Sequence, residues 1–585
     1  MTPILDPRNG DIEDDASSTK KRSMLALAGS LLAEISLPKL AIAWMLLIGF
    51  PGLLLGAAPL LVSIWITAVW SHAANIFYEV LPALLLPPLV AIGWFAGRPL
   101  LRLAESSFWS LNALAVQPAY VAFREGIRHL VEGLFAARIS EAGRGSVRAA
   151  AAAASGLLIC ALGFGIILLV WPATRWVGSL ADLAPLPRLA LVVLANSVVL
   201  ICGYSAIAAL IWGVADATMA QPRDLRAFTP RTEGDRTWRV AHLSDIHTVG
   251  ERYGFRIESG RSGARGNERL RQTLARLDEV HAAHPLDMIL ITGDLTDAGR
   301  SAEWAEFFAA LAAYPKLAEL VIALPGNHDV NVVDRASPAR MDLPMSPMKR
   351  LRQVRTISAL GMLQGARVQV VETQAGKIGS SLADALRRHG DDMAAFADVG
   401  SVRLSRSLGG LWATIFPMVM PPVADDGLGI IVLNSNAETH FSFTNALGLV
   451  SAEQARAFRV AARQYPRACW IVALHHHVIE YPKPAKALSE RIGTALINGS
   501  WFIRRLQHLA DHVVIMHGHR HIDWIGECGG LLIVSAPSPV MEPIDCPETY
   551  FYVHTLAIGT DERLRLLHPE RIVVRSEPVA DEAWM

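Results

Sequence analysis

The side chains best suited to chemistry in this sequence each follow a short apolar stretch. Five such stretches are followed at once by potential metal ligands: 238–244 by Asp245 and His247, 288–293 by Asp294, 319–325 by Asn327, His328 and Asp329, 469–474 by His475, His476 and His477, and 512–516 by His517, His519 and His521. A mixed set of nitrogen and oxygen ligands suits Mn, Fe or Zn, whereas an all-oxygen set would suit Ca or Mg. The sequence therefore predicts a site for transition-metal ions.

The apolar stretches themselves predict the elements that position these ligands. Met288–Thr292 is uninterrupted by polar side chains other than Thr, as in a strand covered on both faces, and Gly293 lets the backbone turn sharply after it. Helical patterns, for example 267–283 and 302–313, alternate with the strands from about Asp235 onward. In open α/β sheets ligands bind beyond the carboxyl ends of the strands. We therefore expect the five motifs to converge at one edge of an α/β domain.

The motifs together closely resemble those of the calcineurin-like metallophosphoesterases. In chain order they are Asp-x-His, Gly-Asp-x-x-Asp, Gly-Asn-His-Asp, a His after a strand, and Gly-His-x-His. The resemblance covers roughly residues 236–575 and implies an α/β four-layer (αββα) sandwich at 235–575, with an insertion or cap at about 331–425. It also implies two divalent metal ions, Mn, Fe or Zn, that hold a hydroxide for in-line attack on phosphorus.

The resemblance also implies a role for each residue. Asp294 would bridge the two ions, and the remaining ligands would divide into one set for each ion: Asp245, His247 and His521 for the first, and Asn327, His475 and His519 for the second. His328 would be the general acid or would stabilise the leaving group, and Asp329 would orient its ring.

Some assignments remain open at this point. His475 stands first after its strand and is the expected ligand, but His476 and His477 are alternatives. Asp297, the second acid of Gly-Asp-x-x-Asp, is expected to support the loop instead of touching metal. His242 is expected in the core, and His517 in packing or in a contact behind the ligands.

The motif details favour some substrates over others. Ala298 and Asp329 stand where the related protein Ser/Thr phosphatases have Arg and Glu, which disfavours a protein phosphatase. The run His242–His247 with Gly-Asn-His-Asp resembles the phosphodiesterase branch, including cyclic-nucleotide phosphodiesterases. A lipid-linked pyrophosphate or a phospholipid is the alternative substrate, and a catalytically inactive membrane scaffold is the alternative outside enzymes. The intact ligand set argues against the scaffold.

Composition separates a membrane region from the predicted catalytic domain. Lys plus Arg and Asp plus Glu both number 54, so no net charge attracts the protein to nucleic acid, and no nucleic-acid partner is expected. The hydrophobic fraction of 52% is concentrated before residue 220, in a membrane region at 38–220 with about four transmembrane helices, at approximately 40–70, 80–96, 149–171 and 189–213. These helices have no charged residue at their centres, which favours anchoring over transport. The alternative is a buried helical bundle in a soluble protein.

Charge in the connecting segments predicts the orientation of this region. Basic residues crowd 98–148 and follow the fourth apolar run, whereas 71–79 has none. The positive-inside rule then gives a multi-pass protein of the cell inner membrane with a cytoplasmic catalytic domain. Residues 1–37 would be a cytoplasmic tail in which 23–35 could form a short interfacial helix. The five Cys form no paired framework, as expected for reduced thiols. Membrane lipid is a further expected partner, and the sequence does not indicate an oligomeric state.

The basic stretch 344–355, with Lys349, Arg350, Arg352 and Arg355, leaves two interpretations open. It could form a lid near lipid headgroups or a phosphate substrate. The alternative is a solvated helix packed on the domain.

Overall fold

The computed structural model describes residues 37–75, 80–95, 97, 117–135, 141–179, 186–250, 267–334, 340–343, 346–373, 375–482, 491, 494, 496–541 and 548–574. The expected interfacial helix at 23–35 lies outside these residues. Contacts divide the described chain into two compact units, one within Ser36–Met219 and the other from Ala220 onward. Each unit is described by itself below.

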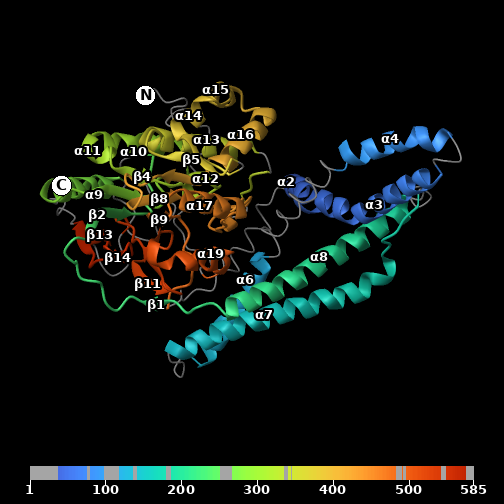
Figure 1. Ribbon diagram of the computed structural model, residues 1–585, viewed down its shortest axis with the longest axis horizontal. Helices are drawn as coiled ribbons and strands as arrows, with labels where there is room; N and C mark the ends of the chain where they lie inside the picture. The colour runs from blue at the N-terminus through green and yellow to red at the C-terminus, as the bar shows by residue number, and fades with distance from the viewer. Residues whose placement is uncertain are drawn as a thin grey trace, which may run out of the picture. The chain divides into compact units, whose positions relative to one another are not determined.

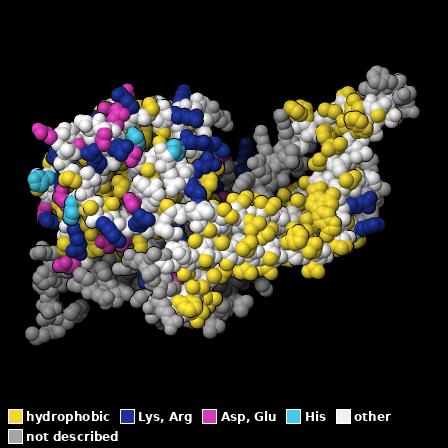
Figure 2. Space-filling view, turned by 60° about the horizontal axis from the view of Figure 1, so that its bottom comes forward, with side chains coloured by type: hydrophobic (Ala, Val, Ile, Leu, Met, Phe, Trp, Pro, Cys, Tyr) yellow, Lys and Arg dark blue, Asp and Glu magenta, His cyan; other side chains and the backbone are white. Residues whose placement is uncertain are grey.

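The first unit is helical throughout. Its elements are α2 (Leu37–Trp44), the π-helix η1 (Met45–Gly49), α3 (Phe50–Ala74), α4 (Val80–Phe95), α6 (Gln117–Phe135), α7 (Glu141–Val170), the 3₁₀-helix η3 (Trp171–Ala173) and α8 (Leu186–Ala217). The four predicted apolar runs correspond to α2–α3, α4, α7 and α8. Hydrophobic side chains cover these helices on the face drawn in Figure 2, whereas charged side chains are spread over the α/β unit.

Three segments of this unit are long and apolar enough to cross a membrane: Phe50–Ala74, Gly143–Ala173 and Leu186–Ala217. Many of their side chains face outward; Trp70 is 77% exposed and Leu169 is 82% exposed. Helix α4 is shorter, since its 16 residues extend only about 24 Å at 1.5 Å each. That length is short of the roughly 30 Å of a bilayer core.

Small residues let these helices pack closely. A Cβ on Gly156 of α7 would lie 2.6 Å from the Ala209 carbonyl oxygen of α8, and one on Gly56 of α3 would lie 1.9 Å from the Val193 carbonyl oxygen. Asn196, buried in α8, donates to the Gly56 carbonyl oxygen at 3.2 Å. Close approach through small residues with a buried amide is typical of helix pairs in membranes.

The second unit contains two β-sheets. A nine-stranded sheet has the order β1-β11-β12-β10-β9-β8-β7-β5-β6, and a six-stranded sheet has the order β14-β13-β2-β3-β4, with β15 paired to β13 (Figure 1). The strands of the large sheet are β1 (Arg223–Asp224), β5 (Gln369–Glu372), β6 (Lys377–Ser381), β7 (Met418–Met420), β8 (Leu428–Val432), β9 (Cys469–Ala473), β10 (Val513–His517), β11 (Trp524–Cys528) and β12 (Leu531–Ser535). Those of the small sheet are β2 (Arg236–Leu243), β3 (Met288–Ile291), β4 (Val321–Ala323), β13 (Thr549–Ile558), β14 (Leu564–Leu566) and β15 (Glu570–Val574).

The central strands of both sheets are parallel, and most of them are fully buried. β2, β3 and β4 run parallel in one sheet, and β8, β9 and β10 in the other. Every residue of β3, β8, β9 and β10 is buried, because helices cover the sheets and one core cluster joins them. The unit is thus an α/β sandwich whose parallel strands deliver their carboxyl ends to shared edges.

Helices connect and cover these strands. They are α9 (Glu268–Ala283), α10 (Ser301–Ala312), α11 (Pro315–Ala318), α12 (Asn327–Val330), α13 (Pro347–Gln364), α14 (Leu382–Arg387), α15 (Gly390–Val399), α16 (Val402–Ile415), η5 (Ser442–Thr444), α17 (Ala452–Gln464), α19 (Gly499–Leu506) and η6 (Gln507–His512). The amphipathic ones, such as α17, bury Ala457, Phe458 and Ala461 and expose their charged side chains.

Two expectations about residues 331–425 need correction. This range is not only an insertion or cap, because β5, β6 and β7 complete one end of the large sheet. Within it, α13 is neither a lid nor solvated: Lys349, Arg352 and Arg355 are at most 5% exposed. Lys349 donates to the Thr439 carbonyl oxygen at 2.7 Å, and Arg355 donates to the Gly299 carbonyl oxygen at 2.7 Å. The basic side chains of α13 therefore hold neighbouring loops in place.

Candidate metal centre

The seven predicted ligands lie in two adjoining clusters. Those from the small sheet follow β2, β3 and β4: Asp245, His247, Asp294 and Asn327. Those from the large sheet follow β9 and β10: His475, His519 and His521. All are buried except His521, which is half-buried. The centre therefore straddles the boundary between the two sheets.

The first cluster contains Asp245, His247 and His521, whose ligand atoms lie within 4.8 Å of one another. His521 Nε2 is 3.2 Å from Asp245 Oδ1 and 3.3 Å from His247 Nε2. His247 Nε2 is also 3.7 Å from Asp294 Oδ2. Donors from β2, β3 and β10 thus meet at one point.

The second cluster contains Asp294, His475 and His519, and Asn327 joins it. His475 Nε2 lies 3.0 Å from Asn327 Oδ1, 3.0 Å from His519 Nδ1 and 3.3 Å from Asp294 Oδ2. Because Asp294 Oδ2 faces a histidine of each cluster, this carboxylate stands where a bridge between two ions would be needed.

The spacing of these donors fits metal ions. Two ligands about 2.0–2.1 Å from a tetrahedral ion are roughly 3.3–3.4 Å apart, close to the separation of His247 Nε2 and His521 Nε2, which is 3.3 Å. His475 Nε2 and His519 Nδ1 lie 3.0 Å apart, so a similar spacing recurs in the second cluster.

The backbone at the ligands is held in an uncommon conformation. Asp245, His247, Asp294, His519 and His521 all have positive φ, between 46° and 78°. Non-glycine residues seldom adopt this left-handed region, and it costs on the order of 1–3 kcal/mol each when they do. Such strain collects at functional sites, where the surrounding structure enforces it.

Glycines beside the ligands permit the close approach of the loops. A Cβ on Gly326 would lie 2.0 Å from Asp294 Oδ1, and one on Gly518 would lie 1.7 Å from Ser244 Oγ. Gly293 has φ +95°, and a Cβ there would lie 2.6 Å from His475 Nδ1. The glycines of these motifs therefore serve the packing of one ligand loop against the next.

The geometry distinguishes among the three consecutive histidines. His475 Nδ1 donates to the Thr292 carbonyl oxygen at 2.8 Å, so Nε2 is the nitrogen that faces the second cluster. Metal-binding histidines usually donate their other N–H in this way. His476 instead has its Nδ1 2.9 Å from Ser435 Oγ, and His477 Nε2 is 3.4 Å from Glu480 Oε1. The arrangement favours His475 as the ligand.

His328 lies beside the first cluster, and the structure changes its expected support. Its Nδ1 is 2.7 Å from the Asp297 carbonyl oxygen, and its ring packs edge-on against His247, with centroids 4.5 Å apart. The Asp329 carboxylate instead accepts from Thr296 N at 2.9 Å and Gly326 N at 2.8 Å. The ring of His328 is thus held by a backbone carbonyl, and Asp329 ties two ligand loops together.

Other contacts at the centre were not foreseen from the sequence. Asp297 Oδ1 lies 3.3 Å from His247 Nδ1, so Asp297 supports two histidines. Glu480 pairs with Arg520, between the two ligands of Gly-His-x-His, at 3.1 Å. Asp297 belongs to a motif that was singled out, whereas Glu480 carries no motif signal.

The two remaining histidines lie behind the ligands. His242 Nε2 is 3.1 Å from Thr292 Oγ1, and its ring lies beside that of His554. His517 stacks on Tyr481, with centroids 6.3 Å apart. Both rings are fully buried.

Charge at the centre is dominated by Asp294 and its neighbours. Burial alone would raise the pKa of the Asp294 carboxyl, but the imidazoles of His475 and His328 outweigh this and hold the pKa well below its usual range. Burial would lower the pKa of His475, but the Asp294 charge overcomes it and raises the pKa to about 9. Asp294 is therefore anionic at neutral pH and attracts cations.

Comparison with known proteins agrees with this geometry. Residues 239–381 match the family of calcineurin-like phosphoesterases. Asp245, His247, Asp294 and Asn327 lie inside this range, and the three histidine ligands lie beyond it. No curated protein matches the chain.

Several solved structures share similarity with 58% of the chain. They are a dimetal phosphatase from Danio rerio (11% identity, 99% of that chain, TM-score 0.31), an NAD nucleotidase from Haemophilus influenzae (11%, 57%, 0.30) and a Staphylococcus aureus protein (13%, 55%, 0.30). The chain thus spans little more than half the length of the last two.

The family match and the metal-binding clusters lie in the same unit of the protein. Residues 239–381 match a calcineurin-like phosphoesterase domain, and clusters of Asp and His side chains in the same unit could hold metal ions.

Proposed function

We propose that the protein is a membrane-anchored phosphodiesterase that uses two divalent metal ions, with Mn, Fe or Zn as the native metals. The observation that carries this proposal is the convergence of seven donors from five strands, with Asp294 shared between the two clusters. Bound there, two divalent cations would acidify a water nucleophile and neutralise charge on the phosphoryl oxygens.

The residues of the chain have separate tasks in this reaction. Asp294 uses Oδ2 towards both clusters, while its Oδ1 accepts from the His328 backbone N–H at 2.9 Å. That second contact fixes the plane of the carboxylate. With both ring nitrogens protonated, His328 donates from Nδ1 to the Asp297 carbonyl oxygen and gives the proton on Nε2 to the leaving oxygen, which leaves a neutral ring. Asp297 and Asp329 position these groups without reaching the phosphorus.

A diester fits the charges at the centre better than a monoester. A monoester dianion carries one more negative charge, which an arginine often neutralises by a bidentate contact. Arg520 stands between His519 and His521, but its guanidinium is paired with Glu480 at 3.1 and 3.2 Å. This pairing, together with the motif resemblance to phosphodiesterases, favours a substrate with a single negative charge at the reacting phosphorus.

Membrane anchoring is the second part of the proposal. The three apolar helices support it, and the basic residues of 98–148 support a multi-pass inner-membrane protein whose α/β unit is cytoplasmic. Intact cells should therefore protect the α/β unit from an added protease. Its digestion in intact cells would overturn this orientation.

A lipid-linked pyrophosphate or a phospholipid is the second candidate substrate. Helix α8 ends at Ala217 and β1 begins at Arg223, so little chain separates an apolar helix from the catalytic unit. That proximity in sequence favours a substrate presented by the membrane itself.

The test compares a diester with a monoester on the full-length, detergent-purified protein loaded with Mn²⁺. Bis-p-nitrophenyl phosphate should be hydrolysed faster than p-nitrophenyl phosphate, and Asp294→Ala should abolish both activities and reduce bound metal to one ion or none. Faster hydrolysis of the monoester would refute the phosphodiesterase assignment. Near-wild-type turnover by Asp294→Ala would refute the shared bridge.

A further inference from the structure

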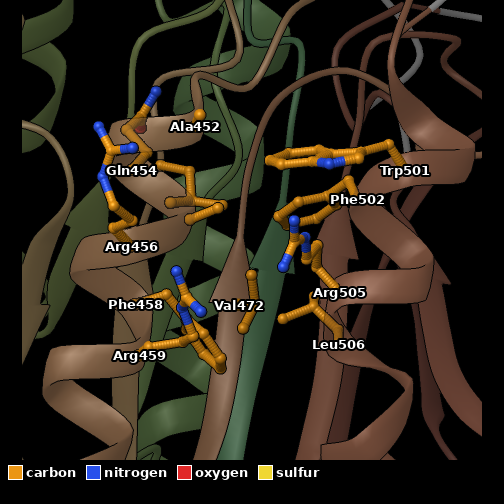
Figure 3. A pocket seen from close by; sticks show the side chains of 12 residues that line it. Ala452, Gln454, Arg456, Phe458, Arg459, Val472, Trp501, Phe502, Arg505 and Leu506 are labelled. Atoms are coloured by element: carbon orange, nitrogen blue, oxygen red, sulfur yellow. The ribbon is translucent and has the colours of Figure 1, made fainter.

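A groove lies between helices α17 and α19, over strands β8 and β9 (Figure 3). Its volume is about 100 Å³. Its inner surface is apolar, with Val472 of β9 below and Phe458, Phe502 and Leu506 on the walls. These three wall residues are at most 3% exposed, so the apolar surface is recessed.

The rim of the groove is positively charged. Arg459 of α17 and Arg505 of α19 lie on opposite sides and direct their guanidinium groups towards the space between the helices (Figure 3). The Arg505 guanidinium lies 5.5 Å from the centre of the Trp501 ring. Arg456 pairs with Glu453 at 3.6 Å, but neither Arg459 nor Arg505 has a carboxylate partner within the described part of the chain.

The shape and charge together restrict the occupant. A flat bilayer would not reach the recessed Phe458 and Phe502, because insertion into lipid needs protruding apolar side chains. A peptide can reach in, if it carries an aliphatic side chain between carboxylates. Guanidinium groups bind carboxylates with two parallel hydrogen bonds, so two arginines facing one another favour a peptide with several acids.

The chain contains such a segment in its own N-terminal tail. Residues 11–15 read Asp-Ile-Glu-Asp-Asp, with one aliphatic residue among four acids. We propose that this acidic segment docks in the groove between α17 and α19, with Ile12 towards the apolar surface and the acids towards Arg459 and Arg505. The proposal is independent of which phosphoester the centre hydrolyses.

The intervening chain is long compared with the catalytic unit. Residues 16–36 separate the acidic segment from the start of α2. At about 3.3–3.6 Å per residue they extend up to roughly 70 Å. A folded domain of about 350 residues has a radius of gyration of roughly 20 Å, so the connecting chain exceeds the width of the catalytic unit.

The groove also lies over strands that position the metal centre. Val472 precedes the ligand His475 by three residues along β9 and its loop. Leu433, which also lines the groove, precedes Ser435, whose hydroxyl accepts from the His475 N–H at 3.2 Å. A segment docked here therefore contacts the outer side of the strands that hold one ligand.

The test replaces Trp501 with the photoreactive residue p-benzoylphenylalanine in the full-length, detergent-purified protein. Irradiation should join the groove to the peptide that contains residues 11–15, as identified by mass spectrometry. The pair Arg459→Glu and Arg505→Glu should reduce the yield of this cross-link by at least about tenfold. Changing the four acids to Arg in that background should restore it, because the charges are then exchanged.

A matched control and a second probe make the result decisive. Arg463→Glu with Arg504→Glu changes the same two helices outside the groove and should leave the yield unchanged. If the Trp501 variant does not fold, the photoreactive residue at Ile12 should label 452–464 or 499–506. The proposal would be overturned if the groove were cross-linked only to lipid, to a second copy or to residues 575–585. It would also be overturned if the charge exchange did not change the yield of the cross-link.

Discussion

Replacing His475, His476 and His477 by Ala, one at a time, tests the geometry of the metal centre most directly. The three side chains are consecutive and all buried, but only His475 Nε2 faces Asn327, Asp294 and His519, at 3.0 to 3.3 Å. His475→Ala should therefore remove one of four donors from the second ion. His476→Ala should remove a hydrogen bond to Ser435 and leave all seven donors in place.

The expected magnitude follows from the number of donors. Four protein ligands bind a structural zinc ion with about 10–16 kcal/mol, so one ligand corresponds to roughly 2.5–4 kcal/mol, or about 100- to 1,000-fold in affinity. His476→Ala should change metal affinity by less than about threefold. It should lower the free energy of unfolding by about 1–3 kcal/mol, since it leaves a buried hydroxyl without its partner.

The assay is titration of the chelator-treated full-length protein with Zn²⁺ by calorimetry, alongside metal content by mass spectrometry after dialysis. His475→Ala should retain one tightly bound ion and bind the other weakly. His477→Ala should keep both ions, because the Nε2 atom of His477 faces Glu480, and its ring only stacks on that of His519. Two tightly bound ions in His475→Ala, or loss of one in His476→Ala, would refute the assignment.

Three further changes test separate parts of the structure. His328→Ala should keep both ions and slow turnover by about 10²- to 10⁴-fold, the usual scale for a lost general acid; loss of metal would make it a ligand. Gly326→Ala should displace the Asp294 carboxylate and reduce metal content. Gly410→Ala in α16 should not, because nothing lies within 4 Å of its new Cβ. Equal metal content in the two variants would refute the argument from close packing. Burial lowers the pKa of His554 to about 3. The unfolded chain, with a His pKa of about 6.5, therefore binds a proton more readily than the folded protein as the pH falls. The free energy of unfolding should then be about 2 kcal/mol lower at pH 5 than at pH 7. His554→Phe should shrink the difference in stability between pH 7 and pH 5 by that amount in thermal unfolding, and an unchanged difference would contradict the buried neutral ring.

The convergence of the ligands could be predicted because each motif combines two local signals. A run such as Cys469–Ala473 is apolar without interruption, which indicates a buried strand, and the next polar residue must then lie at its carboxyl end. Parallel strands bring such ends to one edge whatever the details of their packing. The long apolar runs of α7 and α8 were visible for the same reason.

The contacts that decide individual roles could not be predicted in this way. His475 is distinguished from His476 by the carbonyl of Thr292, the residue that follows β3 of the other sheet. Asp329 lies next to His328 in sequence, yet its carboxylate reaches the amides of the loop after β3. Such contacts depend on how two sheets meet, and no local pattern encodes that meeting.

The strands β5, β6 and β7 were missed because they lack a strong pattern. β6 reads Lys-Ile-Gly-Ser-Ser, and β7 has only three residues. They complete the end of the large sheet. β5 and β6 are only partly buried, and β7 is too short to show an apolar alternation.

The position of the metal centre across the two sheets has a mechanical consequence. Ions bound there would cross-link the two sheets, because each would be held by residues of both. His247 and His521, for example, are 274 positions apart in the chain. Closing so long a loop in an unfolded chain costs conformational entropy. The binding free energy of an ion can offset this cost only after both sheets have formed. Metal loading would then report on completed folding, and metal loss would loosen the sandwich where its two halves meet.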